Sequence, residues 1–177
     1  VIDRVVIKGG SISGFRNGLY CKYMNNSRIK ELEVSGNTYY GIFFSGYQGQ
    51  CDGNTIADCT ISGNGDEGVI LYGQNGQCDG NTIQENTISK NTTKGISLLY
   101  ADGNRVEANN VWGTTGDGTT YGIQTTGASN FILKNTCVGN GINYQLDSDD
   151  TAGPIVSAPG YLSATGDAAH PWANFSK

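Results

Sequence analysis

The chain has 177 residues, enough for one domain with a sizeable core but few for two. Glycine supplies 27 residues and proline only 3, which excludes a collagen-like or proline-rich chain, and the wealth of Ile, Val and Asn favours short strands and turns over a helical bundle. A net charge of −5 with 11 Lys and Arg argues against a nucleic-acid partner, and no apolar run reaches the roughly 20 residues of a membrane-spanning helix.

An internal repeat runs through most of the chain. The octapeptide GQCDGNTI stands at 49–56 and again at 76–83, and weaker copies precede and follow it. Each copy carries an aliphatic anchor: Ile7, Ile29, Ile56, Ile83, Val106 and Ile132. About a dozen residues after each anchor, Gly is followed by an apolar residue, at 18–19, 41–42, 68–69, 95–96, 122–123 and 141–142. The spacing predicts about six coils, each made of three short strands separated by turns.

Coils of this kind bury their apolar side chains only by stacking on one another, at the spacing of about 4.8 Å between neighbouring strands. Equivalent residues then form columns, such as Leu19, Ile42, Val69, Ile96, Ile123 and Ile142. The sequence therefore predicts an all-β solenoid over residues 1–150. Residues 151–177 break the repeat and are expected to form an irregular C-terminal tail that packs on or caps the solenoid, or reaches a neighbouring subunit.

The repeat has a recognisable consensus, N-x-I-x-x-N-x-I, seen at 81–88, 104–111 and 130–137. It resembles the repeats of right-handed parallel β-helix proteins, the pectate-lyase-like superfamily, over residues 5–146. The closing segment HPWANF is similar to the tail of uncharacterised environmental bacterial β-helix proteins. The resemblance implies a right-handed parallel β-helix with stacked asparagines at Asn86, Asn109 and Asn135, a pattern from which Leu32 and Cys59 depart. It leaves function open, because this fold hosts lyases, hydrolases, epimerases, tailspikes and binding modules.

One strand face is the expected place for chemistry. Its outward positions hold no carboxylate and one cation, Lys22, whereas the lyases and hydrolases that share this fold use clustered acids there. The face is instead aromatic and rich in amides, and two loops at 47–50 and 74–77 extend beside it. We predict a sugar-binding surface, with rings that stack on pyranose faces and amides that bind hydroxyls: Tyr40, Phe43, Tyr47, Gln50, Tyr72, Gln74 and Gln77. The alternative is that the tail or another subunit covers Phe43, Ile70 and Tyr72.

Scattered acids offer weaker candidates. Asp66 and Glu67 precede Gly68 and form a catalytic or metal-holding pair, unless they are simply a solvated turn. Asp117 lies in the longest excursion, 113–121, which either walls a groove or is a flexible insertion. The acidic run at 147–150 lacks the ordered ligand spacing of a calcium loop.

Three aspartates and the cysteines complete the candidates. Asp52, Asp79 and Asp102 stand in equivalent Asp-Gly-Asn turns, where they either cap the turn or bind calcium. Cys51 and Cys78 occupy equivalent places in adjacent coils, within reach of a disulfide or as buried free thiols. The lone His170 has no recognisable partner, so we expect no cofactor, with calcium as the one alternative.

These observations predict an extracellular or cell-surface β-helix module that faces carbohydrate and binds or scaffolds rather than catalyses. One alternative is a fragment of a polysaccharide lyase or glycoside hydrolase. Another is a self-assembling filament or surface-layer subunit, joined through the open N-terminal end or the tail, because exposed strand edges invite pairing.

Overall fold

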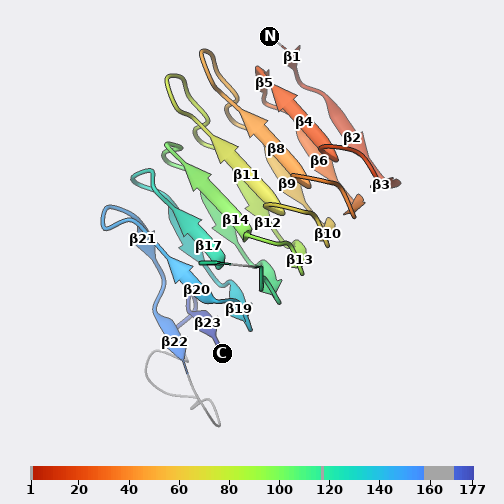
Figure 1. The fold of residues 1–177 in the computed structure, drawn as a ribbon. Helices are drawn as coiled ribbons and strands as arrows, with labels where there is room; N and C mark the ends of the chain where they lie inside the picture. Colours follow the sequence, from red (N-terminus) through yellow and green to blue (C-terminus); the bar gives the residue numbers. More distant parts are fainter. Residues whose placement is uncertain (1, 117, 158–169) are drawn as a thin grey trace.

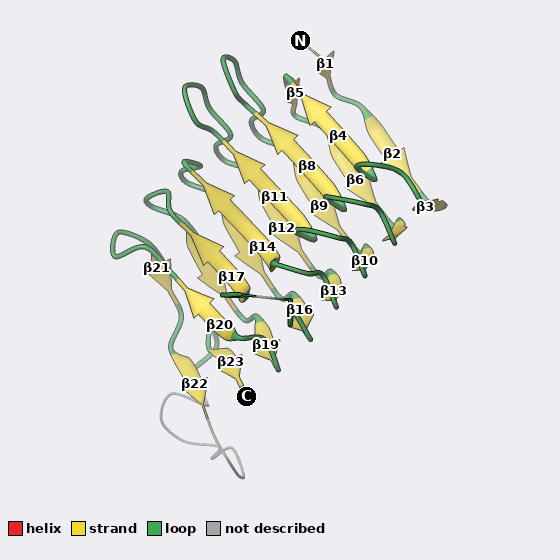
Figure 2. Ribbon diagram, in the orientation of Figure 1, coloured by secondary structure: helices red, strands yellow, loops and turns green. Residues whose placement is uncertain are grey.

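The chain winds into a parallel β-solenoid, as the repeat predicts. In the computed structural model, which describes residues 2–116, 118–157 and 170–177, the strands lie in register coil upon coil and every pairing is parallel (Figure 1). The described residues contain strands and loops and no helix (Figure 2). This confirms the all-β, right-handed parallel β-helix. No described element is a helix with the length and apolar character needed to cross a membrane.

Three long sheets run the length of the described solenoid. The β4–β20 sheet holds β4 (Leu19–Lys22), β8 (Ile42–Ser45), β11 (Val69–Tyr72), β14 (Lys94–Leu99), β17 (Tyr121–Thr125) and β20 (Ile142–Gln145). The β2–β21 sheet holds β2 (Val6–Lys8), β6 (Arg28–Lys30), β9 (Thr55–Ala57), β12 (Thr82–Gln84), β15 (Arg105–Glu107), β18 (Phe131–Leu133) and β21 (Thr151–Ala152). The β3–β22 sheet holds β3 (Ser11–Ser13), β7 (Glu33–Ser35), β10 (Thr60–Ser62), β13 (Thr87–Ser89), β16 (Asn110–Trp112), β19 (Thr136–Val138), β23 (Asn174–Ser176) and β22 (Ile155–Ser157). The strands β1 (Ile2–Asp3) and β5 (Met24–Asn25) form a separate two-stranded sheet.

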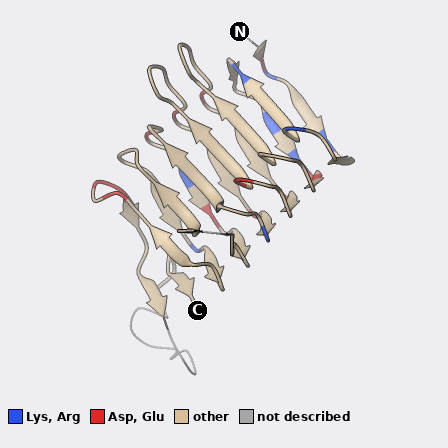
Figure 3. Cartoon of the chain, in the orientation of Figure 1, with Lys and Arg blue, Asp and Glu red and all other residues tan. Residues whose placement is uncertain are grey.

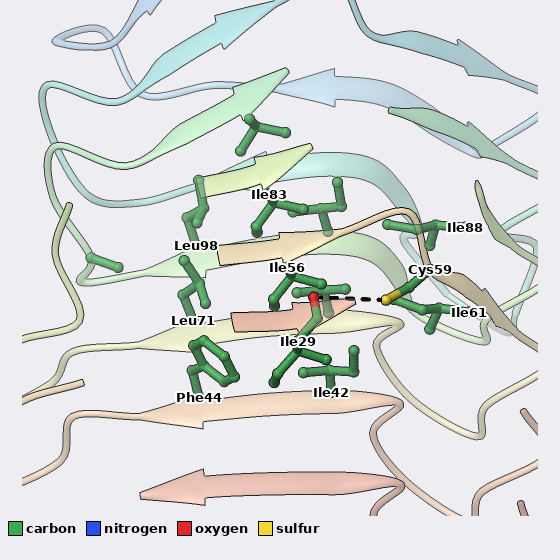
Figure 4. Close-up of a cluster of buried hydrophobic side chains, with 14 of the residues drawn as sticks. Ile29, Ile42, Phe44, Ile56, Cys59, Ile61, Leu71, Ile83, Ile88 and Leu98 are labelled. Carbon is green, nitrogen blue, oxygen red and sulfur yellow. Dashed lines mark hydrogen bonds between the residues drawn. The ribbon is translucent and has the colours of Figure 1, made fainter. Parts of the chain in front are cut away.

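The core consists of columns of identical or similar aliphatic side chains. Ile29, Ile56 and Ile83 are register partners in adjacent coils, and each is at most 1% exposed. In the facing sheet Phe44, Leu71 and Leu98 stack in the same way (Figure 4). Because side chains alternate across a strand, the residues between them point outward and line the outer faces of the solenoid.

Asparagines stack at the corners between sheets and satisfy the backbone there. The predicted ladder of Asn86, Asn109 and Asn135 is present, with each side-chain oxygen accepting a hydrogen bond from the backbone N–H of the residue one coil before. Cys59 lacks the amide, but its N–H donates to Asn86 Oδ1 at 2.9 Å. A second ladder runs through Asn54, Asn81, Asn104 and Asn130, and a third through Asn37, Asn64 and Asn91.

The segment after residue 150 adds strands to two of the sheets. β21 extends the β2–β21 sheet, and β23 pairs with both β19 and β22. Asn174 continues the first ladder, since its Oδ1 accepts from the backbone N–H of Asn135 at 2.9 Å. The described parts of this segment therefore continue the parallel strand pairing of the coils before it.

All five cysteines are free and buried. Cys78 Sγ donates to the carbonyl oxygen of Cys51 at 3.5 Å, so the two equivalent cysteines contact each other as thiols. Of the two arrangements that the spacing allows, the structure has the buried free thiols.

Candidate functional site

A line of aromatic rings crosses the outer face of the β4–β20 sheet. We call Tyr20, Tyr40, Phe43, Tyr72 and Tyr100 the aromatic strip. Neighbouring ring centroids are 5.0 Å apart for Tyr20 and Phe43 and 4.9 Å for Tyr40 and Phe43. The line continues from Phe43 to Tyr72 at 6.4 Å and from Tyr72 to Tyr100 at 6.2 Å. These are the spacings and tilts of interacting aromatic pairs, so the strip is one continuous surface.

The parallel register of the sheet produces this line. Tyr20 and Phe43 are outward register partners on β4 and β8, and Ile70 takes the next place on β11. Ile70 is only 4% exposed, so it adds little to the outer surface beside its register partner Phe43. Tyr100, 55% exposed in the turn after β14, was not predicted from the sequence. The described C-terminal strands pair in other sheets, away from Phe43.

The two extended loops lie against each other at one end of the strands. The N–H of Gln77 donates to the carbonyl oxygen of Gly49 at 2.8 Å, and Gln50 Nε2 donates to Gln77 Oε1 at 2.6 Å. The Tyr72 hydroxyl hydrogen-bonds to Gln74 Oε1. Gln50, Gln74 and Gln77 thus stand beside the strip on a shared loop wall. Tyr47 lies at this wall too, with Lys22 Nζ 5.9 Å from its ring centroid.

The Asp66–Glu67 pair lies beside Tyr40, at the edge of the strip where β11 begins. Glu67 is 4% exposed, and its Oε1 is 2.7 Å from Lys94 Nζ, while Oε2 is buried without a hydrogen-bond partner. Asp66 Oδ1 accepts from Thr93 Oγ1 at 2.6 Å. Burial raises the pKa of Glu67; the Lys94 ammonium opposes this rise and the Asp66 carboxylate adds to it. Burial, and next the Glu67 and Asp66 carboxylates, raise the pKa of the Tyr40 hydroxyl, which places this ring beside the acids.

The buried ion pair predicts an unusual pH dependence for a Lys94→Met variant. The folded protein holds the Glu67 proton more tightly than the unfolded chain does, so stability falls as pH rises from the ordinary glutamate pKa, about 4.3, to the raised one. Removing Lys94 takes away the group that limits this rise. We expect the urea midpoint of the variant to fall more steeply than that of the natural protein between about pH 5 and pH 8.

Lys8→Met is the matched control, because Lys8 makes an exposed ion pair with Glu31 at 3.3 Å. This variant should keep the pH dependence of the natural protein, since exposed pairs contribute little. Parallel pH curves for Lys94→Met and the natural protein would contradict a buried, ionised Glu67. Adding Glu67→Gln to Lys94→Met should remove the extra steepness, because no carboxylate then titrates at this position.

The stacked aspartates cap turns. Asp52 Oδ1 accepts from the backbone N–H of Asp79 at 2.9 Å, and Asp79 Oδ1 accepts from the N–H of Asp102 at the same distance. Asp102 Oδ1 in turn accepts from the N–H of Ala128 at 2.7 Å. One oxygen of each carboxylate thus serves a neighbouring coil, as expected for a capped turn. Asp117 lies outside the described residues.

Most of the acidic residues lie at the turns, whereas several Lys and Arg lie on strands (Figure 3). Across residues 2–116, 118–157 and 170–177, no three His, Cys, Asp or Glu side chains are grouped so that they hold a metal ion. The calcium alternative at Asp52, Asp79 and Asp102 therefore remains a prediction without a closed ligand set.

The chain matches one protein family and several solved structures. The family described as periplasmic copper-binding protein (NosD) matches residues 2–153. A mutant of the periplasmic alginate epimerase AlgG has a TM-score of 0.70 and 19% identity over 99% of this chain and 45% of its own. The Dettilon tailspike protein has 0.68 and 17%, over 98% and 38%. The A-module of the mannuronan C-5 epimerase AlgE6 from Azotobacter vinelandii has 0.63 and 13%, over 99% and 58%. No curated protein matches the chain significantly.

At these identities the solved structures establish the fold, and this chain spans less than half of the first two. The family description names copper, which proteins bind through thiolate, thioether and imidazole groups. Here the thiols point into the sealed core: Cys51 and Cys78 are fully buried, and burial raises the pKa of the Cys21 thiol to about 12. His170 Nδ1 accepts from the backbone N–H of Trp172 at 3.2 Å. The described residues do not fit a copper site.

Proposed function

We propose a polysaccharide-binding role, outside the cytoplasm, for this chain, which belongs to the NosD family of periplasmic copper-binding proteins. The aromatic strip is the observation that carries the proposal. Its rings are aligned across adjacent coils, and Tyr20 and Tyr100 at its two ends are more than half exposed. A monomeric protein seldom exposes a continuous apolar surface without a partner.

A sugar polymer suits this surface better than a protein partner does. Pyranose rings present flat C–H faces that stack on aromatic rings, and the row of rings offers several such contacts in line. The glutamine amides of the loop wall stand beside the strip and provide both donors and acceptors for sugar hydroxyls. Two of the structural neighbours are named as epimerases of alginate and of mannuronan, which supports a polysaccharide as the ligand of this fold.

The central ring of the strip should dominate binding. Phe43 contacts three other rings, so Phe43→Ala removes a stacking platform and loosens its neighbours. We expect its affinity for the bound polysaccharide to fall about tenfold or more, the effect of deleting an aromatic hot spot. The measurement is a glycan array followed by calorimetric titration of the strongest ligand.

Phe131→Ala is the control, because Phe131 is an exposed phenylalanine (43%) on β18, in a different sheet. It should bind as the natural protein does. Equal affinities for Phe43→Ala and Phe131→Ala would place the glycan elsewhere. Failure of the natural protein to bind any glycan, together with concentration-dependent fibres, would favour the self-assembling subunit instead.

The second candidate is a polysaccharide lyase or hydrolase, and one observation favours it. Glu67, with a raised pKa and an unpaired oxygen, lies beside Lys94 and Tyr40 at the edge of the strip. Such a cluster is suited to proton transfer. Unsaturated or reducing-end products from a bound polymer, lost in Glu67→Gln, would establish this activity, whereas binding without product supports the module.

A further inference from the structure

A groove of about 600 Å³ lies at the Tyr100 end of the aromatic strip. One wall is the loop 73–77, with Gln74, and the other wall comes from later coils, with Asp102, Asp147 and Asp149. Tyr100 lines the groove between them. The strip therefore does not simply end at this ring but runs into a concave site.

A step in loop length creates this groove. The loops 46–50 and 73–77 have the same length and stack closely, with the N–H of Gly46 donating to the carbonyl oxygen of Tyr72 at 2.8 Å. The next coil passes from Leu99 to Asp102 through two residues only. That coil therefore has no loop to stack on the loop 73–77, and the Tyr100 ring is left exposed beside it.

The polar side chains of the groove have atoms that are free to hydrogen-bond a ligand. Asp102 Oδ1 accepts from the N–H of Ala128, and Asp147 Oδ1 from the N–H of Asp149, while the hydrogen bonds between described residues leave both Oδ2 atoms free. Gln74 uses its oxygen for the Tyr72 hydroxyl, which leaves its amide hydrogens for a ligand.

The charge of the groove selects among sugars. Three carboxylates and no Lys or Arg stand among its described lining residues. The cations Arg16 and Lys22 stack on Tyr39 and Tyr23 near the opposite end of the strip, so they do not neutralise the groove. An acidic sugar would meet like charge here, whereas the hydroxyls of a neutral sugar donate well to carboxylates.

We propose that this groove is a subsite for one neutral pyranose residue of the polymer bound along the strip. The sugar stacks one face on Tyr100, donates hydroxyl hydrogens to Asp102 and Asp147, and accepts from the Gln74 amide. The inference rests on the proposed polysaccharide-binding function and adds its specificity: the polymer is neutral at this position, unlike a polyuronate.

The test compares oligosaccharides of one length and different charge. Cello-, manno- and galacto-oligosaccharides of six residues are titrated against oligogalacturonate and oligomannuronate of the same length, in EDTA. We expect at least one neutral series to bind about tenfold more tightly than either uronate, and Tyr100→Ala to lose about tenfold in that affinity. The Phe131→Ala variant should keep the natural affinity.

Charge-neutral variants test the role of the acids without loss of the turns. Asp102→Asn and Asp147→Asn keep an Oδ1 that accepts the same backbone N–H groups. Together they should weaken neutral-sugar binding and narrow the gap to the uronates at least threefold. Preference for uronates, or neutral-sugar binding unchanged in both Tyr100→Ala and the double variant, would overturn this subsite and leave the strip intact. Absence of binding to every oligosaccharide would overturn the strip and the subsite together, and uronate binding that appears only when calcium is added would make the groove a cation site.

Discussion

Replacing Asn109 by alanine is expected to lower the free energy of unfolding by about 3–5 kcal/mol, a large part of the stability of a domain this size. Asn109 is 1% exposed and lies at the centre of the first asparagine ladder. Its Oδ1 accepts from the backbone N–H of Asn86 at 3.1 Å and from Asn86 Nδ2 at 3.0 Å. Its Nδ2 donates to the carbonyl oxygen of Ile83 at 2.9 Å and to Asn135 Oδ1 at 3.0 Å.

Alanine keeps none of these hydrogen bonds, and the groups left behind are too deeply buried for water to replace them. Each buried donor or acceptor without a partner costs about 1–3 kcal/mol, and the removed amide served several of them. The neighbouring Asn110 supplies a matched control, because it has the same side chain but is exposed. Asn110→Ala should stay within about 0.5 kcal/mol of the natural protein in urea unfolding. Equal midpoints for the two variants would show that the ladder contributes little.

The periodicity of the aliphatic anchors was enough to predict the coil architecture. A three-strand coil has one way to bury Ile29, Ile56 and Ile83 together, which is to stack them, and the structure does so. The second and third asparagine ladders were missed, although Asn81, Asn104 and Asn130 stand in the quoted consensus. Their role depends on which backbone N–H groups lose a partner at a corner, and that follows only from the three-dimensional path of the chain.

Part of the candidate site could also be predicted from the sequence. Outward alternation placed Phe43 and Tyr72 on one face, because a short strand fixes the direction of every side chain. Tyr100 was not predicted because it lies in a turn, where side chains do not alternate between two faces. Its exposure also depends on the shortness of the loop in its own coil compared with the loop 73–77. The ion pair of Lys94 with Glu67 was not predicted, because it requires the coil stacking that brings residues 27 apart in the sequence to 2.7 Å.

The second large loss of stability is expected at a column of glycines. Gly41, Gly68, Gly95 and Gly122 precede the inward residues of the β4–β20 sheet, and the sequence marks them without explaining them. A Cβ on Gly95 would lie 2.2 Å from Val111 Cγ1 and 2.6 Å from the carbonyl oxygen of Gly122. The first contact is with a buried side chain and the second with the backbone of the next coil, so neither atom has room to retreat.

Gly95→Ala is therefore expected to destabilise the protein by about 3 kcal/mol or more, at the upper end of the cost of overpacking a core. Gly103→Asn is the control: Gly103 has φ +62°, a conformation that asparagine accepts, and a Cβ there meets nothing within 4 Å, so its cost should stay near 1 kcal/mol. The double variant Gly95→Ala with Val111→Ala removes one of the two clashes. It should be less destabilised than the sum of the single variants, because the residues are in contact. Additive losses, or a Gly95→Ala variant as stable as Gly103→Asn, would mean that the coils are packed less tightly at this column than the distances require.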